Sequence, residues 1–373
     1  MIVGFDATTL TGRISGVGYY TARLMESLAN GAGEGVVRRL VVFSNRPVNV
    51  EETDRVQVYE RRRFAVRSVW MQLVLPRILR DVRPDLVHFT NYLAPLAGSV
   101  PYVVSFHDMS LSLLPQCHTL KKRLLTSSLI PAVARGARMI LTPSESTRRD
   151  VVRLLRVDPG RVRVIPYAAS PSFRPMPALP EGLHALGVRA PYFLYVGTLE
   201  PRKNLARALR AFASVAGGLP GCRFVIVGQR GWRYAEVLRA ADHPALRGRV
   251  DFLGYLPEER LPALYAHALA LVYPSLYEGF GLPVVEAMAC GTPVLTSRSS
   301  SLAEIGEGAA LLADPTDERA LAGALHSLAT DAALREKLRA LGLERARAFS
   351  WERTGRETVA AYQEVYEEVR RRP

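Results

Sequence analysis

The stretch that decides the fold of this chain runs Tyr273-Pro-Ser-Leu-Tyr-Glu278-Gly-Phe-Gly-Leu-Pro283-Val-Val-Glu286-Ala-Met-Ala-Cys-Gly291-Thr-Pro293. Its Gly-Phe-Gly-Leu-Pro turn follows an apolar run and is typical of the passage from a strand into a helix. Pro283 suits the first helical position, where its missing N–H would have had no partner. Two glutamates, Glu278 and Glu286, therefore flank the start of a predicted helix.

The start of this predicted helix is a candidate anion site. The backbone N–H groups of Phe280, Gly281 and Leu282 have no partner within the helix, and the positive end of the helix dipole lies behind them. Phosphate commonly occupies such a position. Glu278 and Glu286 can accept hydrogen bonds from sugar hydroxyls on either side of that phosphate, which describes a nucleotide sugar. The alternative is an ordinary strand-to-helix turn with two solvated glutamates.

The segment resembles the E-x7-E signature of retaining glycosyltransferases of family 4, which have the GT-B fold. Further matches extend from Gly16 to Trp351, so the resemblance covers nearly the whole chain. It implies that Glu278 contacts the donor sugar and that Glu286 contacts the ribose.

The length and composition of the chain favour a globular protein with two domains. It has 373 residues, of which 48% are hydrophobic and 23% charged. No apolar run is long enough for a transmembrane helix, and the first residues favour a buried strand over a leader, so we expect a cytoplasmic protein. Cys117, Cys222 and Cys290 have neither disulfide nor metal-site spacing.

Apolar runs alternate with longer helical patterns, which favours parallel sheets covered on both faces. The expected strands of the first half are Ile2–Phe5, Leu40–Phe43, Leu86–Phe89, Tyr102–Phe106, Met139–Leu141 and Val162–Ile165. Those of the second half are Tyr192–Val196, Phe224–Val227, Val250–Phe252, Leu269–Tyr273, Val294–Thr296 and Ala310–Leu312. The fold class is therefore α/β, with two doubly wound domains. Ligands of such sheets bind beyond the carboxyl ends of the strands.

A cluster of prolines between Pro166 and Pro191 separates the two halves and predicts a linker at residues 171–190. The resemblance assigns the acceptor side to an N-terminal domain of residues 1–170 and the nucleotide sugar to a C-terminal domain of residues 191–351. In a GT-B protein the two sheets face a central cleft. The resemblance also implies that a final helix, at about 352–373, packs back on the N-terminal domain.

A basic loop follows the first strand of the second half, in Gly197-Thr-Leu-Glu-Pro-Arg202-Lys203-Asn204. It is similar to the family's loop for the donor pyrophosphate. Thr198 stands where many members of the family have Arg, so we expect Arg202 to supply the second cation beside Lys203. The alternative is a basic turn with solvated side chains, although cations at a helix N-terminus oppose the helix dipole.

Two glycines near the N-terminus, Gly16 and Gly18, resemble the glycine-rich loop that approaches the donor phosphate from the other domain, where a side chain would not fit. The third glycine of the dinucleotide fingerprint is absent, which makes an NAD-dependent enzyme a poor interpretation. Among the other segments, Gly254 and Tyr255 resemble the part of the family whose backbone meets the nucleotide base.

The end of the strand Tyr102–Phe106 carries His107 and Asp108, and the resemblance places such a histidine near the anomeric carbon. His88, at the end of the preceding strand, is the competitor for this role, and either histidine can instead be structural. Ser144 and Glu145 resemble a Ser-Glu loop of the family that lines the acceptor side. An N-cap is an equally good interpretation of Ser144.

The chain contains no Asp-x-Asp, the pair with which metal-dependent glycosyltransferases hold a cation on the leaving diphosphate. We therefore expect no metal and no cofactor. Arg202, Lys203 and the helix N-terminus would then stabilise the leaving group.

The positive charge is concentrated in the first half. Residues 1–180 contain 25 Lys and Arg against 13 Asp and Glu, an excess of 12, whereas the rest has 24 against 22, an excess of 2. The densest part includes Arg61, Arg62, Arg63 and Arg67. Together with Trp70, Leu73 and Ile78 these cations suit a surface on anionic lipid, although Pro76 would kink a helix here. A solvated face and a nucleic-acid site are the alternatives; we expect no nucleic acid.

The sequence thus predicts a retaining, metal-independent hexosyltransferase that uses a nucleoside diphosphate sugar. In it, His107, Arg202, Lys203 and Glu278 are the catalytic candidates. The local sequence resembles that of bacterial members of the family that transfer mannose in cell-surface polysaccharide assembly. We therefore expect GDP-mannose as the donor and a glycan or lipid-linked molecule as the acceptor. A GT-B sugar-nucleotide epimerase and a non-catalytic nucleotide-sugar or lipid-binding module remain the alternatives.

Overall fold

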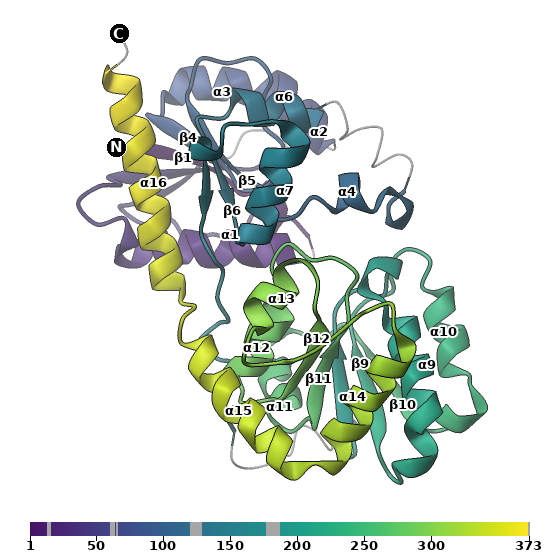
Figure 1. Ribbon diagram of the computed structural model, residues 1–373. Helices are drawn as coiled ribbons and strands as arrows, with labels where there is room; N and C mark the ends of the chain where they lie inside the picture. The colour runs from purple at the N-terminus through teal and green to yellow at the C-terminus, as the bar shows by residue number, and fades with distance from the viewer. Residues whose placement is uncertain (13–15, 60–63, 65, 120–128, 177–186, 372–373) are drawn as a thin grey trace. The chain divides into compact units, whose positions relative to one another are not determined.

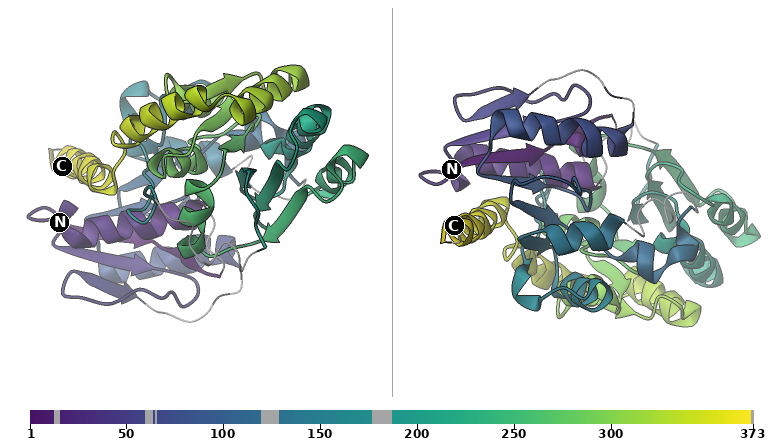
Figure 2. Two further views of the ribbon diagram at one scale, coloured as in Figure 1. Left: turned by 90° about the horizontal axis from the view of Figure 1, so that it is seen from below. Right: turned by 90° about the horizontal axis from the view of Figure 1, so that it is seen from above.

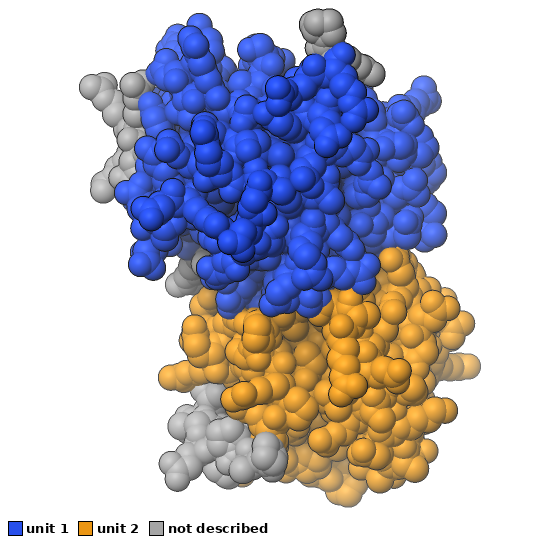
Figure 3. All heavy atoms as spheres, turned by 90° about the vertical axis from the view of Figure 1, so that its left-hand side faces the viewer, with its two compact units in different colours: residues 1–113, 120–167, 350–373 blue, residues 114–119, 168–349 orange. Residues whose placement is uncertain are grey.

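The computed structural model describes residues 1–12, 16–59, 64, 66–119, 129–176 and 187–371. The chain forms two compact units, coloured separately in Figure 3. Unit 1 comprises residues 1–113, 120–167 and 350–373, and unit 2 comprises residues 114–119 and 168–349. None of the described helices combines the length and apolarity needed to cross a membrane.

The described strands of unit 1 form one parallel sheet in the order β3-β2-β1-β4-β5-β6-β7. They are β1 (Ile2–Asp6), β2 (Arg39–Phe43), β3 (Val56–Tyr59), β4 (Leu86–Phe89), β5 (Tyr102–Ser105), β6 (Met139–Thr142) and β7 (Val162–Val164). The helices are α1 (Gly16–Ser27), α2 (Arg67–Val69), α3 (Leu75–Val82), α4 (Ser110–Leu113), α6 (Leu129–Gly136), α7 (Glu145–Leu155) and α16 (Trp351–Arg371). The sheet and its helices appear in the upper part of Figure 1.

Unit 2 contains a second parallel sheet, whose described strands follow the order β10-β9-β8-β11-β12-β13. They are β8 (Tyr192–Val196), β9 (Arg223–Val227), β10 (Val250–Gly254), β11 (Ala270–Tyr273), β12 (Val294–Ser297) and β13 (Leu311–Ala313). The helices are α9 (Leu205–Val215), α10 (Ala235–Ala241), α11 (Leu261–Ala266), α12 (Leu282–Ala289), α13 (Ser300–Gly306), α14 (Glu318–Thr330) and α15 (Ala332–Ala346). Helices cover both faces of each sheet, as Figure 2 shows from two sides.

Each run that the sequence predicts as a strand coincides with a strand, but β3 was not predicted. Its sequence, Val-Gln-Val-Tyr, alternates apolar and polar residues, and β3 pairs with β2 alone at the edge of its sheet. Only Val56 of this strand is buried. The continuous apolar signal that marks the central strands is therefore missing.

The basic segment of unit 1 differs from its predicted form. Trp70 and Ile78 are 1% and 2% exposed, so these two side chains belong to the core and not to a lipid-facing surface. Pro76 lies in the first turn of α3, after a π-helical turn at Trp70–Val74, where its missing N–H removes no hydrogen bond from the helix. Arg61, Arg62 and Arg63 lie outside the described residues.

Helix α16 is long and packs on unit 1 close to α1, as the yellow helix of Figure 1 shows. A Cβ at Gly355 would overlap the Ser27 hydroxyl, so glycine lets the two helices approach closely. The Ser27 hydroxyl donates a hydrogen bond to the Trp351 carbonyl (2.8 Å). Further along α16, the Tyr362 hydroxyl lies 2.7 Å from Nδ1 of His88 in β4.

We expect Tyr362→Phe to lower the free energy of unfolding of unit 1 by about 1–3 kcal/mol, because the change leaves a buried ring nitrogen of His88 without its partner. Chemical denaturation, followed by circular dichroism, measures the loss. Tyr366→Phe, one turn along α16 at a partly exposed position, is the matched control and should change stability little. Equal stability of the two variants would show that the His88 contact does not hold α16.

Candidate functional site

The sheet of unit 2 has a topological switch point between β8 and β11. The chain leaves β8 toward β9 through α9, whereas it leaves β11 toward β12, on the opposite side, through α12. Two loops therefore diverge at the carboxyl ends of these neighbouring strands, residues 197–204 and 274–281. A crevice between such loops is where ligands of doubly wound sheets bind.

A buried cluster of charged side chains joins these two loops. Glu278 is held on both oxygens: Lys203 Nζ lies 2.7 Å from Oε1, and Arg202 lies 2.8 Å from Oε2. Arg202 also pairs with Glu200 (2.9 Å), and Lys203 donates to the Tyr273 hydroxyl (2.6 Å). The structure thus brings three of the four predicted catalytic residues into direct contact.

The cations of this cluster fix the charge of Glu278. Burial alone would raise the pKa of the Glu278 carboxyl, but Arg202 and Lys203 outweigh burial and lower it to about 2. At neutral pH the carboxylate is therefore ionised and, with both oxygens occupied by cations, a weak base.

Hydrogen bonds to backbone carbonyls hold the two loops in register. Asn204 adopts a left-handed conformation (φ 59°), and its side-chain Nδ2 donates to the carbonyls of Pro274 (3.0 Å) and Pro315 (2.7 Å). The Leu276 N–H donates to the Arg202 carbonyl (2.9 Å). Asn204 and Tyr273 also belong to this site, although neither was among the predicted site residues. The signal for Asn204 was its place directly before a helix, where asparagine tolerates positive φ.

The start of α12 has backbone N–H groups that are available to a ligand. Helix α12 begins at Leu282, so Pro283 is its second residue and not its first. Gly281 has φ 111°, and a Cβ there would lie 2.6 Å from Leu302, which makes glycine necessary at this turn. Within the described residues, the N–H groups of Gly281 and Leu282 have no protein acceptor. The ring of Phe280 is buried against Phe349.

Two serines that the sequence analysis missed fix this turn from α13. The Ser300 hydroxyl accepts from the Glu278 N–H (3.1 Å), and the Ser301 hydroxyl contacts the carbonyls of Glu278 (2.9 Å) and Phe280 (2.8 Å). These contacts fix the backbone from Glu278 to Phe280, directly before the Gly281 and Leu282 N–H groups of the predicted anion site. Nothing in the local sequence pattern marks the two serines, because they lie more than twenty residues from Glu278.

Glu286 has a different environment from Glu278. It is buried on α12 and accepts a hydrogen bond from the Tyr265 hydroxyl (2.8 Å). Burial raises the pKa of the Glu286 carboxyl, the Tyr265 hydrogen bond lowers it and the charge of Glu258 raises it, and the result of the three is a pKa of about 7. Near neutral pH this carboxyl is therefore close to its titration point.

The remaining donor-side candidates of unit 2 lie at the same sheet edge. A Cβ at Gly228 would overlap the Gly197 carbonyl, so the turns after β8 and β9 touch through their backbones. The Thr198 carbonyl accepts from the Tyr195 hydroxyl (3.1 Å). The Gly254 carbonyl accepts from the Gly228 N–H (2.8 Å), and Tyr255, which follows it, is 49% exposed.

In unit 1 the two histidines have separate environments. His88 is fully buried, with Tyr362 at one ring nitrogen and the Ser105 hydroxyl (2.8 Å) at the other. Burial lowers the pKa of His88 to about 3, and it is a structural residue between β4, β5 and α16.

His107 lies beyond the end of β5. Its Nε2–H donates to the Thr90 carbonyl (2.7 Å), so its Nδ1 accepts from the Tyr167 hydroxyl (2.6 Å). Burial lowers the pKa of His107 to about 4, which keeps the ring neutral at pH 7. A substrate can reach a ring nitrogen of His107 only by replacing one of these partners.

The other candidates of unit 1 take up local structural roles. Gly16 is the first residue of α1 and Gly18 lies in its first turn, so both belong to the helix start and not to a separate loop. Asp108 accepts from the N–H (2.9 Å) and hydroxyl (2.7 Å) of Ser110. Ser144 is the N-cap of α7, accepting from the Thr147 N–H (3.1 Å), and Glu145 pairs with Arg148 (3.3 Å).

Comparison with known proteins assigns the family. The sequence model of "Glycosyl transferases group 1" matches residues 184–345, and that of "Glycosyltransferase Family 4" matches residues 14–172. O-antigen chain mannosyltransferase B of Escherichia coli is 32% identical, over 94% of this chain and 96% of that protein. The chain belongs to this glycosyltransferase family.

Solved structures of glycosyltransferases share the fold. Sucrose-phosphate synthase of Thermosynechococcus elongatus aligns over 98% of this chain and 99% of its own, with a TM-score of 0.78 and 22% identity. HepE of Anabaena, solved with UDP-glucose, aligns over 99% of both chains with a TM-score of 0.72 and 18% identity. The predicted GT-B fold and the predicted class of enzyme, a glycosyltransferase, are confirmed. The stereochemical course, the donor and the independence of metal stay predictions.

The environment of Glu286 predicts a pH dependence of stability for this glycosyltransferase. The folded protein keeps the Glu286 proton up to a pKa of about 7, whereas an unfolded chain releases it near 4.5. The resulting stabilisation is complete below pH 4.5 and is lost as the pH rises through 7. Glu286→Gln should remove this loss, so that the variant gains stability over the wild type from pH 5 to pH 8. Thermal unfolding across this pH range measures the gain, and Glu236→Gln on the exposed face of α10 is the control. If thermal stability changed with pH in the same way in the wild type and in Glu286→Gln, the raised pKa of Glu286 would be contradicted.

Proposed function

We propose that this glycosyltransferase moves a mannosyl or related hexosyl group from a nucleoside diphosphate sugar to a hydroxyl of a polysaccharide or glycolipid, with retention and without metal. The observation that carries the proposal is the Glu278–Arg202–Lys203 cluster at the switch point, beside the start of α12. It combines an ionised carboxylate for a sugar with cations and backbone donors for a diphosphate. The E. coli O-antigen mannosyltransferase supports the choice of mannose and of a polysaccharide acceptor.

Each residue of the cluster has a task in this reaction. As the bond to the sugar breaks, negative charge grows on the leaving diphosphate, and Arg202, Lys203 and the Gly281 and Leu282 N–H groups would stabilise it. A carboxylate has about four acceptor positions, so Glu278 can hold its two cations and still accept from a sugar hydroxyl. Glu286 would accept from the ribose, and a neutral His107 would support the anomeric centre.

The state of Glu278 favours retention by attack on the same face over a covalent intermediate. A carboxylate nucleophile must have an oxygen available and enough basicity to attack. In Glu278 both oxygens pair with cations, and the pKa is about 2. The leaving phosphate, which is the stronger base, is therefore the better group to assist the incoming hydroxyl. Support for independence of metal comes from the missing Asp-x-Asp and from the cations already present.

An anionic membrane surface is the proposed place where this enzyme meets its acceptor. Four of the six large hydrophobic side chains that are exposed within the described residues lie in two segments of unit 1: Val66, Val69 and Leu73 in one, and Leu96 in the other. The Gln72 side chain joins the two segments, bonding the Ala94 carbonyl and the Leu96 N–H (both 2.9 Å). Arg67 is not part of the exposed charge, because it pairs with Asp6 (3.4 Å).

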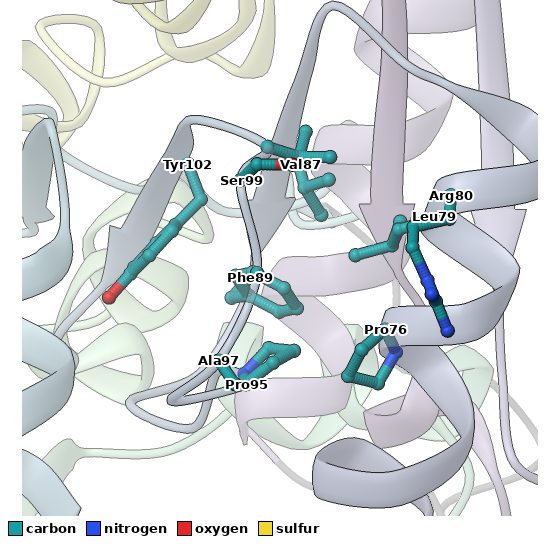
Figure 4. Close-up of a pocket in the computed structure, with 11 residues that line it drawn as sticks. Pro76, Leu79, Arg80, Val87, Phe89, Pro95, Ala97, Ser99 and Tyr102 are labelled. Carbon is teal, nitrogen blue, oxygen red and sulfur yellow. The ribbon is translucent and has the colours of Figure 1, made fainter.

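A cavity adjoins this apolar surface. Residues 90–101, which connect β4 to β5, contain no helix. A cavity of about 300 Å³ lies between this connection, α3 and the two strands. Figure 4 shows the Phe89 and Tyr102 rings, Pro76 and Pro95 around it, with Arg80 from α3. An apolar wall beside the exposed cations Arg77 and Arg80 suits the chain and headgroup of an anionic lipid.

Transfer is tested with a panel of nucleoside diphosphate hexoses in the presence of EDTA, with a mannose-containing glycan as acceptor. The expected product is a glycan extended with an α-linked sugar from an α-linked donor, and GDP-mannose should serve as donor. NMR of the product gives the anomeric configuration. Activity that EDTA abolishes and manganese restores would contradict the metal-independent mechanism. Release of an altered free sugar without transfer would establish an epimerase instead.

Membrane contact is tested by sedimentation with vesicles of anionic or neutral phospholipid. Each cation near an anionic surface contributes on the order of 1 kcal/mol, so Arg77→Ser with Arg80→Ser should weaken binding roughly 10- to 30-fold. Leu73→Ser with Leu96→Ser should weaken binding to the same vesicles through loss of apolar contact. Arg247→Ser with Arg319→Ser removes the same charge from exposed positions of unit 2 and should bind like the wild type. Equal binding of all variants, or binding to neutral vesicles alone, would contradict the proposed surface.

A further inference from the structure

The charges of the Glu278 cluster already balance one another. Its two cations, Arg202 and Lys203, are paired with two carboxylates, Glu278 and Glu200, at 2.7–2.9 Å. The four groups together carry no net charge, whereas a nucleoside diphosphate carries at least two negative charges. The cluster alone therefore supplies directed hydrogen bonds but little net attraction for the donor.

Releasing the cations from Glu278 would be costly. The Glu278 side chain is only 9% exposed, and a carboxylate left in that position without its partners would be a buried, uncompensated charge. Arg202 and Lys203 therefore remain shared with Glu278 when a diphosphate binds. Further cations have to come from another part of the same sheet edge.

The loop after β9, residues 228–234, lies directly against the turn after β8. The Leu199 N–H donates to the Gln229 carbonyl (3.0 Å), and the Gly231 N–H donates to the Leu199 carbonyl (3.1 Å). A Cβ at Gly228 would overlap the Gly197 carbonyl, and a Cβ at Gly231 would lie 2.6 Å from the Thr198 methyl group. Two glycines thus let this loop sit on the Gly197–Leu199 turn.

This loop carries two exposed arginines, Arg230 and Arg233. Both side chains lie against neighbouring rings: the guanidinium of Arg230 is 5.4 Å from the Tyr234 ring centre, and that of Arg233 is 5.8 Å from the Trp232 ring centre. Within the described residues, neither forms an ion pair. Burial raises the pKa of the Cys117 thiol, the charges of Arg202 and Arg233 lower it, and that of Glu200 raises it. Arg233 therefore lies in the electrostatic neighbourhood of the cluster.

We propose that Arg230 and Arg233 provide the net positive charge that binds the donor diphosphate, in addition to the paired cations Arg202 and Lys203. The loop 228–234 then belongs to the donor site, although it is separate in sequence from the Arg202-Lys203 loop and from the α12 start. This inference rests on the proposed use of a nucleoside diphosphate sugar.

The proposal is tested by titrating GDP, UDP, guanosine and uridine into wild type, Arg230→Gln and Arg233→Gln, with isothermal calorimetry. A hydrogen bond to a charged group contributes about 1.5–3 kcal/mol, so each variant should bind the diphosphate roughly ten times more weakly or worse. Binding of the uncharged nucleoside should not change. The loss should also shrink at high salt, because screening weakens the attraction in the wild type.

Arg239→Gln is the matched control, since it removes an exposed arginine from α10 beyond the loop. It should bind the diphosphate like the wild type. Diphosphate affinity unchanged in both loop variants would overturn the inference, as would an equal loss of diphosphate and nucleoside affinity, which indicates a folding defect or a role at the base. A wild-type protein that binds none of the nucleoside diphosphates would instead overturn the proposed function, so the two failures are distinct.

Discussion

The pairing of Glu278 with Arg202 and Lys203 is the interaction on which the rest of the candidate site in unit 2 depends. It joins the loops that leave the sheet on either side of the switch point, and those loops also carry the start of α9 and of α12. Without the two cations, a carboxylate at this buried position would be protonated or expelled toward water. The same contacts therefore decide the loop geometry, the charge of Glu278 and the direction of the α12 donors.

The strands of both sheets could be predicted from the sequence because central parallel strands are buried on two faces and read as continuous apolar runs. The edge strand β3 lacks that signal, since its outer residues face solvent. Glu278, Arg202 and Lys203 could also be predicted as site residues, because a glycine turn before a helix and a basic turn after a strand each have a local sequence pattern. The pairing between them could not be predicted, because Lys203 and Glu278 are 75 residues apart.

The histidines illustrate the same limit. His88 lies near the end of an apolar strand and His107 follows one, so their sequence contexts are alike. What separates them is the helix α16, whose Tyr362 reaches His88 from 274 positions along the chain. A residue that becomes structural through so distant a partner cannot be told from a candidate catalytic residue by its own neighbours. Gly228 presents the converse case, because its need for glycine arises from the Gly197 carbonyl of another loop.

The two glutamates of the signature stretch differ in charge because of what surrounds them, not because of their depth. Both are buried, and burial alone would raise the pKa of each. Two cations reverse the effect at Glu278, whereas Glu286 has only the Tyr265 hydroxyl to oppose it. One end of the α12 start therefore holds a permanent negative charge and the other a carboxyl that can be neutral. A nucleoside diphosphate sugar presents hydroxyls to both ends and charge only between them. In the proposed function Glu278 would meet the sugar and Glu286 the ribose, so a Glu286 carboxyl that can be neutral would keep the repulsion of the diphosphate low. The net attraction would then come from the proposed cations outside the cluster.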